Sequence, residues 1–292
     1  MGTTDGRIIG KTKIIDNGPA SQRWNLVIMS DGYRESEMTK FAADAQNVAN
    51  NLLTIAPFNQ LRRAINVYRV DVASTDSGAD DPTTCGGTGR VAATYFDATF
   101  CGNNIRRLLL ANNMTAFNVA NAQVPEYHLI MIIVNSNIYG GSGGSVAVFS
   151  NAPNAVEIAF HEIGHTAFNL ADEYEYYRGC DSNETGHDNY SGAEPVEANA
   201  TINTNRATIK WRHHISSSTV VPTTRNANCT RCDSQTSPVP AGVVGAFEGG
   251  RYFHCRIFRP EFNCRMRTIS APFCAVCQER IRSVLTPFMP NP

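Results

Sequence analysis

The chain has 292 residues, which allows one large domain or two small ones with room for a buried core. Hydrophobic residues make up 42% and charged residues 17% of the sequence, a balance typical of folded globular proteins rather than disordered ones. The net charge of -1 gives no basis for long-range attraction to nucleic acid. The longest apolar run, residues 129–134, is too short to span a bilayer, so we expect no membrane insertion.

The first part of the chain predicts three strands and one helix. β-prone runs predict strands at residues 7–15, 24–29 and 65–72. Between the second and third strands, apolar residues from Met38 to Ile55 step by three and four, which predicts an amphipathic helix that Pro57 ends.

An acidic, turn-rich loop follows at residues 75–84. Its Asp76, Asp80 and Asp81 are candidate ligands for a structural Ca²⁺, since calcium takes carboxylate oxygens, and a solvated loop is the alternative. Cys85 and Cys101 bracket the next segment. We expect them to form a disulfide.

The middle of the chain predicts a short helix at residues 103–111 and a strand at 128–134, whose continuous apolar run favours a central position buried on both faces. A glycine-rich loop at residues 139–145 then leads into residues 146–149, a candidate edge strand. An edge strand has unpaired backbone groups that can bind an extended peptide. An ordinary hairpin arm is the alternative.

Residues 161–165 contain the pattern HExxH. On a helix, residues four apart share a face, so His161 and His165 can hold one zinc ion while Glu162 reaches the water that the metal activates. For this composition, an accidental match is expected roughly 0.007 times. The apolar stripe of residues 156–170 is centred roughly 150° from the histidines. We therefore expect the helix to pack one face into a core and to turn its ligand face outward.

A catalytic zinc ion needs a third protein ligand and an open position for water. Asp172 would lie about 16 Å from His161 along a continuous helix, out of reach of the metal. The helix must therefore end between His165 and Asp172, and Asn169 is the expected breaker because Asn tolerates the left-handed conformation. Glu173 is the alternative third ligand, or a partner that orients a ligating histidine.

The predicted elements divide the chain into residues 1–174, which carry the zinc-binding helix, and residues 175–292, and both parts form one catalytic unit. The second part begins with a polar insertion at about 175–245, which shows little periodicity. Adjacent histidines at 213–214 would point to opposite sides of an extended chain, which indicates surface residues rather than paired ligands. A last amphipathic helix is predicted at about 273–285.

Nine cysteines suit an exported protein with several disulfides, and their odd number leaves at least one outside the pairs within the chain. Cys229/Cys232 and Cys274/Cys277 have CxxC spacing. A second, structural zinc bound by these two pairs is the alternative to disulfides.

The first residues lack the charged region and apolar core of a signal peptide. Either a presequence has been removed or the protein is not exported by that route. Because of the cysteines we expect the first, a secreted or periplasmic protein.

The zinc motif resembles that of the metzincins, in which a glycine and a third ligand follow HExxH. Here Phe168 occupies the glycine position, and Asn169 and Asp172 each come one residue late. This offset, with the ending Asp172-Glu173-Tyr174, resembles the bacterial IgA peptidase family of metzincin-like zinc endopeptidases. The resemblance spans about residues 24–285. Further matching segments are residues 30–33 (SDGY), 209–211 (IKW), 258–260 (FRP), 264–267 (CRMR) and 273–277 (FCAVC).

This resemblance implies an α/β (α+β) fold: a mixed, mostly parallel twisted sheet with helices, and an irregular C-terminal part across an active-site cleft. It also implies that Met266 belongs to a Met-turn, a tight turn that supports the zinc-binding histidines without binding the metal. Tyr174 and Tyr252 are candidates for stabilising the oxyanion, and each also fits a structural role.

We therefore expect a zinc-dependent endopeptidase that acts on proteins or peptides, with immunoglobulin A among the candidate substrates. One Zn²⁺ would be held by His161, His165 and Asp172, and Glu162 would be the general base. Two other classes stay open. One is a zinc-containing binding or adhesion module without activity, against which Glu162 argues. The other is a zinc amidase acting on a non-peptide substrate such as a glycan N-acetyl group.

Overall fold

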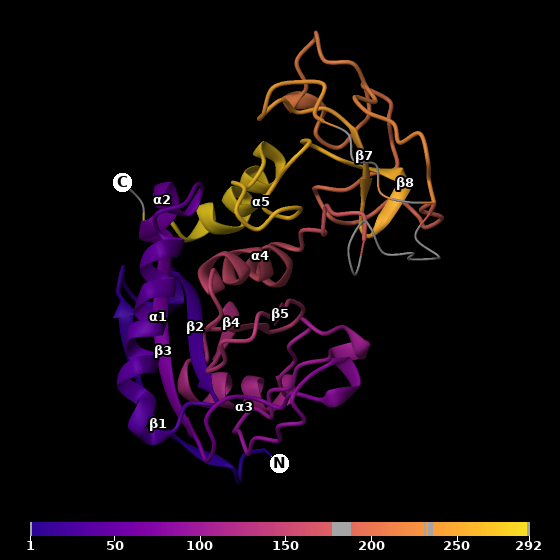
Figure 1. The fold of residues 1–292 in the computed structure, drawn as a ribbon. Helices are drawn as coiled ribbons and strands as arrows, with labels where there is room; N and C mark the ends of the chain where they lie inside the picture. Colours follow the sequence, from indigo (N-terminus) through magenta and orange to yellow (C-terminus); the bar gives the residue numbers. More distant parts are fainter. Residues whose placement is uncertain (1, 177–187, 231, 233–235, 291–292) are drawn as a thin grey trace. The chain divides into compact units, whose positions relative to one another are not determined.

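The computed structural model describes residues 2–176, 188–230, 232 and 236–290. The chain forms two units: residues 1–167 together with 284–292, and residues 168–283 (Figure 1). Within the described residues, no helix has the length and apolar character needed to cross a bilayer. The division expected from sequence, at residues 174/175, stays a prediction.

A six-stranded sheet with the strand order β1-β3-β2-β4-β6-β5 forms the centre of the first unit. Its strands are β1 (Gly6–Ile15), β2 (Trp24–Asp31), β3 (Ile65–Ser74), β4 (Leu129–Val134), β5 (Gly141–Ser142) and β6 (Ala147–Ser150). The three inner pairings, β3 with β2, β2 with β4 and β4 with β6, are parallel. The outer strands β1 and β5 pair antiparallel. The predicted mixed, mostly parallel sheet is therefore confirmed.

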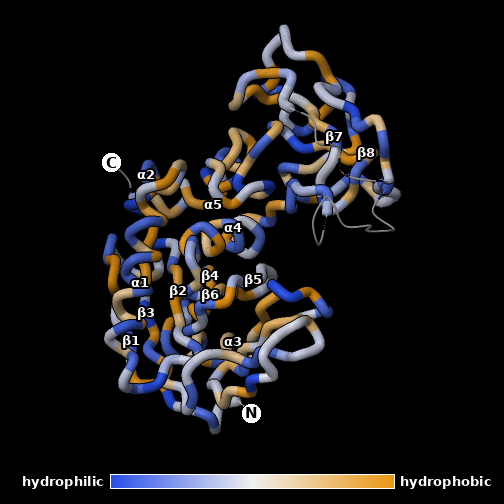
Figure 2. Tube along the Cα trace, viewed as in Figure 1, coloured by the Kyte–Doolittle hydropathy of each residue, from blue (hydrophilic) through white to orange (hydrophobic). Residues whose placement is uncertain are grey.

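Continuous apolar sequence accounts for the central position of β2 and β4. Every residue of both strands is buried, and Figure 2 shows β4 within the hydrophobic centre of the sheet. Parallel strands covered on both faces need apolar side chains on both sides, which is why these strands lack the alternation of a half-exposed strand. The central strand predicted at residues 128–134 is thus confirmed.

The described helices are α1 (Met38–Leu52), α2 (Phe58–Leu61), α3 (Asn113–Gln123), α4 (Ala155–Phe168) and α5 (Ala275–Leu285). The predictions for α1, α4 and α5 are confirmed, with ends that differ by a few residues. The helix predicted at residues 103–111 is wrong, because Asn103 and Asn104 adopt positive φ and form only a single 3-10 turn. The helix begins later, where the side chain of Asn112 accepts a hydrogen bond from the N–H of Thr115 and caps α3.

The strand predicted at residues 146–149 is present, but it is not an edge strand, and its antiparallel pairing with β5 is the hairpin arrangement given as the alternative. It corresponds to β6, which lies between β4 and β5. The glycine-rich residues expected to form a loop supply the edge strand β5 themselves. On the outer side of β5, Gly141 N–H donates to Arg107 O at 3.1 Å, and Gly141 O accepts from Leu109 N–H at 3.4 Å. The peptide-binding edge predicted at residues 146–149 is therefore paired on both sides, and the outer side of β5 is itself partly paired within the chain.

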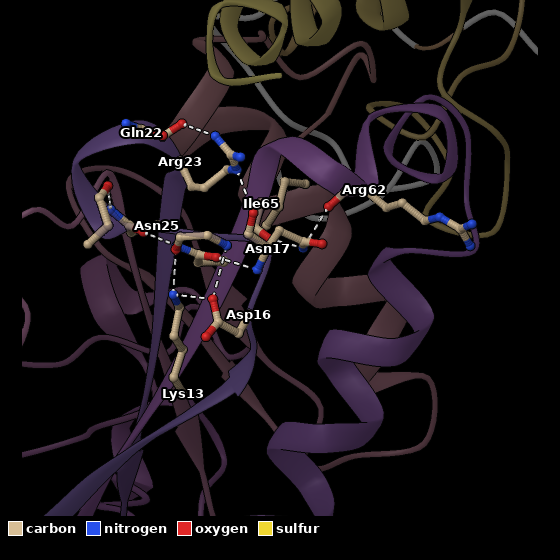
Figure 3. A network of polar contacts seen from close by, with 11 residues as sticks. Lys13, Asp16, Asn17, Gln22, Arg23, Asn25, Arg62 and Ile65 are labelled. Carbon is tan, nitrogen blue, oxygen red and sulfur yellow. Dashed lines mark hydrogen bonds and ion pairs between the residues drawn. The ribbon is translucent and has the colours of Figure 1, made fainter. Parts of the chain in front are cut away.

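A polar network joins the turn after β1 to the start of β3 (Figure 3). The side-chain amide of Asn17 donates to Arg62 O at 3.0 Å and to Ile65 O at 2.6 Å. The carbonyl of Asn17 accepts from Arg23 Nε at 2.8 Å. Asn17 thus connects the turn after β1 to the backbone of residues 62–65 and to the side chain of Arg23.

Asp31, at the carboxyl end of β2, holds the loop that follows β3. Its fully buried carboxylate accepts hydrogen bonds from Phe96 N–H at 2.9 Å, Ala98 N–H at 3.1 Å and Thr94 Oγ1 at 2.9 Å. One carboxylate therefore satisfies several buried donors that have no strand partner.

The second unit has little regular structure among its described residues. A two-stranded antiparallel hairpin is formed by β7 (Phe247–Gly250) and β8 (Phe253–Arg259). A disulfide between Cys229 and Cys255 ties the polar segment to β8. The irregular C-terminal part expected from the sequence agrees with the small amount of helix and strand in this unit.

We predict that Asp31→Ala lowers the free energy of unfolding by about 3 kcal/mol, because it leaves several buried donors without an acceptor, each costing about 1–3 kcal/mol before relaxation. Urea denaturation measures the change. Glu35→Ala is the control, since the ion pair of Glu35 with Arg7 is exposed and its loss should leave stability unchanged. Equal stability of the two variants would contradict the role of Asp31.

Candidate metal centre

His161 and His165 lie one turn apart on α4 and face each other. Their Nε2 atoms are 3.1 Å apart and their rings are nearly perpendicular, at 85°. A tetrahedral zinc ion with Zn–N distances near 2.0–2.1 Å places two nitrogen ligands about 3.3 Å apart. The two imidazoles therefore fit adjacent corners of a zinc coordination sphere.

The ligand face of α4 is less exposed than expected, although His165 is only partly buried. His161 is 7% exposed and Glu162 is 9% exposed. A Cβ atom on Gly141 would lie 3.2 Å from Glu162 Oε1, and one on Gly143 would lie 2.8 Å from His165 Cβ. Glycine allows this close approach because it has no side chain. The glycine run was visible in the sequence, but its position over α4 was not.

α4 ends between His165 and Asp172, as binding of one metal ion by both residues requires. Phe168 is its last residue, and Asn169 adopts φ 50°, in the left-handed region. The guanidinium Nε of Arg280, on α5, donates to Phe168 O at 3.0 Å. This bond satisfies one of the carbonyls that a helix end leaves unpaired. The helix break predicted at Asn169 is confirmed.

The segment with Asp172 is held by its neighbours in the second unit. The buried side chain of Asn199 accepts from Ala171 N–H at 2.8 Å and donates to Ala171 O at 2.9 Å. Arg251 N–H donates to Asp172 O at 2.8 Å, and Glu173 N–H donates to Met266 O at 2.7 Å. Asn199 was missed by the sequence analysis, because a single Asn in a polar, aperiodic segment gives no signal.

Tyr252 contacts the side chain of Asp172, with its hydroxyl donating to Asp172 Oδ2. Burial, followed by the charge of Asp172, raises the pKa of Tyr252 above its ordinary value, so the phenol stays a donor. The ring of Tyr174 lies against that of Tyr252, with centroids 5.3 Å apart. Both tyrosines singled out from sequence are thus in the surroundings of Asp172.

Met266 is fully buried within a tight turn. The turn is closed by hydrogen bonds from Arg267 N–H and Thr268 N–H to Cys264 O, at 2.9 and 2.8 Å. Through its carbonyl, Met266 supports Glu173 directly after Asp172. The turn therefore lies beside the segment that carries the candidate third ligand.

The carboxyl group of Glu173 lies among three buried thiols, those of Cys264, Cys274 and Cys277. Burial raises the pKa of Glu173 well above its ordinary range, and the nearby Cys264 adds to the shift. Burial also raises the pKa of Cys274 and of Cys277. Glu173 thus occupies a different environment from Asp172, although the two residues are adjacent.

The remaining described cysteines form disulfides. The predicted Cys85–Cys101 pair is confirmed. Cys229 is bonded to Cys255, and Cys232 is also in a disulfide. The alternative of one zinc bound by both CxxC pairs is therefore wrong, because the first pair is oxidised. Cys180 lies outside the described residues.

Two other predictions concern polar clusters. His213 and His214 were expected to diverge, but they lie in a 3-10 turn, and both Nε2 atoms reach Glu279, at 2.9 and 3.0 Å. In the acidic loop, Asp76 Oδ2 accepts from Ala93 N–H at 2.9 Å, and Asp80 Oδ1 accepts from Ala92 N–H at 2.7 Å. Asp81 Oδ2 likewise accepts from Thr88 N–H. These carboxylates shape the loop, and calcium binding there stays a prediction.

We predict that Asn169→Val lowers the free energy of unfolding by about 1–2 kcal/mol, the cost of placing a side chain with a branched Cβ in the left-handed region. Asn169→Gly serves as the matched control and should keep wild-type stability, since glycine adopts this conformation freely. Urea denaturation of both variants measures the difference. Valine and glycine variants of equal stability would show that the conformation of residue 169 does not limit the fold.

Comparison with known proteins bears on the function of this arrangement. No curated protein matches the chain. The profile of one protein family, described as IgA Peptidase M64, matches residues 12–238 and 231–285, which together cover most of the chain and include α4, the segment of Asp172 and the turn of Met266. The family predicted from the motifs is confirmed, and the chain belongs to the IgA peptidase M64 family.

Proposed function

We propose that this protein is a zinc-dependent endopeptidase. The observation that carries the proposal is the pair of imidazoles on α4, which face each other at the separation that a tetrahedral zinc ion requires. Glu162 lies between them in the sequence, as in zinc peptidases that use HExxH. Membership of a peptidase family supports a protein or peptide substrate.

His161, His165 and Asp172 would hold the ion, since two imidazoles and one carboxylate form a known ligand set for catalytic zinc. Asp172 is preferred over Glu173 because the carboxyl of Glu173 is packed among three cysteines. The end of α4 at Phe168 also supports a third ligand from this segment, because a continuous helix would carry Asp172 away from the histidines.

The bound zinc ion would supply a water of lowered pKa and would polarise the scissile carbonyl. Glu162 would take a proton from that water and pass it to the leaving amine. The hydroxyl of Tyr252 would orient the carboxylate of Asp172, the role that outer partners have at zinc sites. The turn of Met266 would fix the position of this segment, in the manner of a Met-turn.

The substrate class follows from the family and from the cysteines. The family description makes immunoglobulin A one candidate substrate. Disulfides at Cys85–Cys101 and Cys229–Cys255 support a location outside the reducing cytosol, where such a substrate is present. We propose a secreted or periplasmic enzyme.

Glu162→Gln tests the mechanism. Loss of the general base should lower kcat/KM for peptide hydrolysis by about 10²- to 10⁴-fold while the histidines keep their metal. Glu157→Gln, on the first turn of the same helix, is the matched control and should keep full activity. The measurement is cleavage of a peptide panel and of immunoglobulin A, with products identified by mass and zinc determined on the same samples.

Each alternative predicts a different result in this assay. Full activity of the Glu162→Gln variant with zinc bound would contradict the proposed role of Glu162 as the general base. Zinc retention without hydrolysis of any peptide would favour a binding module. Release of acetate from N-acetylated glycans, without peptide cleavage, would favour the amidase.

We predict that Tyr252→Phe weakens zinc binding about 10- to 100-fold, because it removes the hydroxyl that donates to Asp172. Competition with a chromophoric chelator measures the affinity. Tyr190→Phe is the control, since the hydroxyl of Tyr190 donates instead to Ala193 O. A Tyr252→Phe variant with wild-type zinc affinity would remove this tyrosine from the site.

A further inference from the structure

Three cysteines and one glutamate form a second group of side chains with the chemistry of a metal site. Each of Glu173, Cys264, Cys274 and Cys277 offers one ligand atom, and these four atoms lie within 4.8 Å of one another. All four residues are at most 2% exposed. The group lies within the second unit, and none of its four members is one of the three proposed catalytic ligands.

The separations within this group match a tetrahedral zinc ion. With Zn–S distances near 2.3 Å, two thiolate ligands lie about 3.8 Å apart, and a thiolate and a carboxylate oxygen lie about 3.5 Å apart. The Sγ atoms of Cys264 and Cys277 are 3.7 Å apart. Cys277 Sγ lies 3.6 Å from Glu173 Oε1. A disulfide would bring two sulfurs to about 2.0 Å, so these atoms are not bonded to each other.

Backbone N–H groups are directed at the sulfur atoms. Cys274 N–H donates to Cys264 Sγ at 3.2 Å, and Cys277 N–H donates to Cys274 Sγ at 3.4 Å. Met266 N–H also donates to Cys264. Such donors stabilise thiolates, the form in which cysteine binds a metal. A disulfide would not need them.

Glu173 gives an independent indication of a missing partner. Its Oε1 accepts from the side-chain amide of Asn199 at 2.9 Å. Its Oε2 is buried and has no hydrogen-bond partner. An unpaired buried carboxylate oxygen is costly, and a cation would remove that cost. The side chain of Asn199 would then orient the carboxylate of Glu173 by a hydrogen bond, as partners of metal-binding carboxylates do.

The oxidation state of the other cysteines makes the group distinctive. Cys85, Cys101, Cys229, Cys232 and Cys255 are all in disulfides. Only Cys264, Cys274 and Cys277 are free among the described cysteines, and they are adjacent in space. Three thiols cannot all be paired by one disulfide, whereas one metal ion satisfies the three thiols and Glu173 together.

We propose that Glu173, Cys264, Cys274 and Cys277 bind a structural zinc ion, separate from the catalytic one. Four protein ligands fill a tetrahedral site, so no position stays open for water, as in zinc sites that stabilise a fold. Binding would release the thiol protons and join Glu173 to the turn before Met266 and to the start of α5. The ion would thereby fix the segment that carries Asp172.

The test uses the full chain with the proposed catalytic site removed. A His161→Ala/His165→Ala variant should retain one zinc ion per chain, whereas the wild type holds two. After exchange with Co²⁺, this variant should show the near-ultraviolet bands of thiolate-to-cobalt charge transfer, since no cysteine belongs to the catalytic site. Absence of both zinc and these bands would overturn the proposal. So would mass spectrometry that finds a disulfide among Cys264, Cys274 and Cys277.

Failure of the proposed catalytic site gives a different pattern. If the histidine variant held as much zinc as the wild type and showed the cobalt bands, the result would support the structural site. It would contradict the assignment of His161 and His165 as ligands of a second zinc ion.

A matched pair of variants tests the carboxylate ligand without removing a cysteine. Glu173→Gln should lose zinc from the second site to a competing chelator at least about tenfold more readily and should alter the cobalt spectrum. Glu261→Gln is the control: Glu261 is also buried near Cys264, but its Oε1 accepts from Ala275 N–H. The control should match the parent protein. Identical cobalt spectra for the Glu173 variant and its parent would overturn the four-ligand assignment.

Discussion

The end of α4 is the constraint on which the proposed chemistry depends. A helix rises about 1.5 Å per residue, so it can align His161 with His165 but cannot bring a residue seven positions further along to the same metal. The helix stops at Phe168 and the chain turns at Asn169. The same turn starts the second unit, in which the backbone bonds of residues 171–173 are made to Asn199, Arg251 and Met266.

Asp172 and Glu173 are adjacent in this segment, but their side chains lie in different environments. Asp172 meets a hydroxyl, that of Tyr252, whereas Glu173 meets thiols and the amide of Asn199. Two adjacent carboxylates are therefore not interchangeable. The surroundings separate them into the proposed ligand of the catalytic ion and a carboxyl group that is enclosed among thiols. A sequence that reads Asp-Glu carries no sign of this division.

What could be predicted from the sequence is what local patterns specify. Continuous apolar residues located β4, and apolar steps of three and four located α1 and α5. The HExxH spacing placed both histidines on one face of α4. These features depend on residues close together in the chain, where periodicity reflects geometry directly.

The parts that could not be predicted depend on distant residues. Asn199 is significant only because the chain returns it to Ala171, and Gly143 only because its loop covers α4. The group around Glu173 joins residues up to 104 positions apart, and it includes one CxxC pair as free thiols, whereas the other pair is in disulfides. No periodicity records such contacts, so the sequence left disulfides and zinc as open alternatives.

The character of the second unit explains why cross-links matter there. Its described residues contain one two-stranded hairpin and most of α5, and Ala171, Ala200 and Ile257 form an apolar cluster with Tyr190 and Phe253 packed against it. Outside these elements the described backbone of the unit has no ladder of strand or helix hydrogen bonds to hold it. Covalent and metal cross-links can supply the missing rigidity. The Cys229–Cys255 disulfide constrains one side of the hairpin, and the proposed structural zinc constrains the segment of Glu173. Rigidity beside Asp172 would thus come from the cysteines and not from secondary structure.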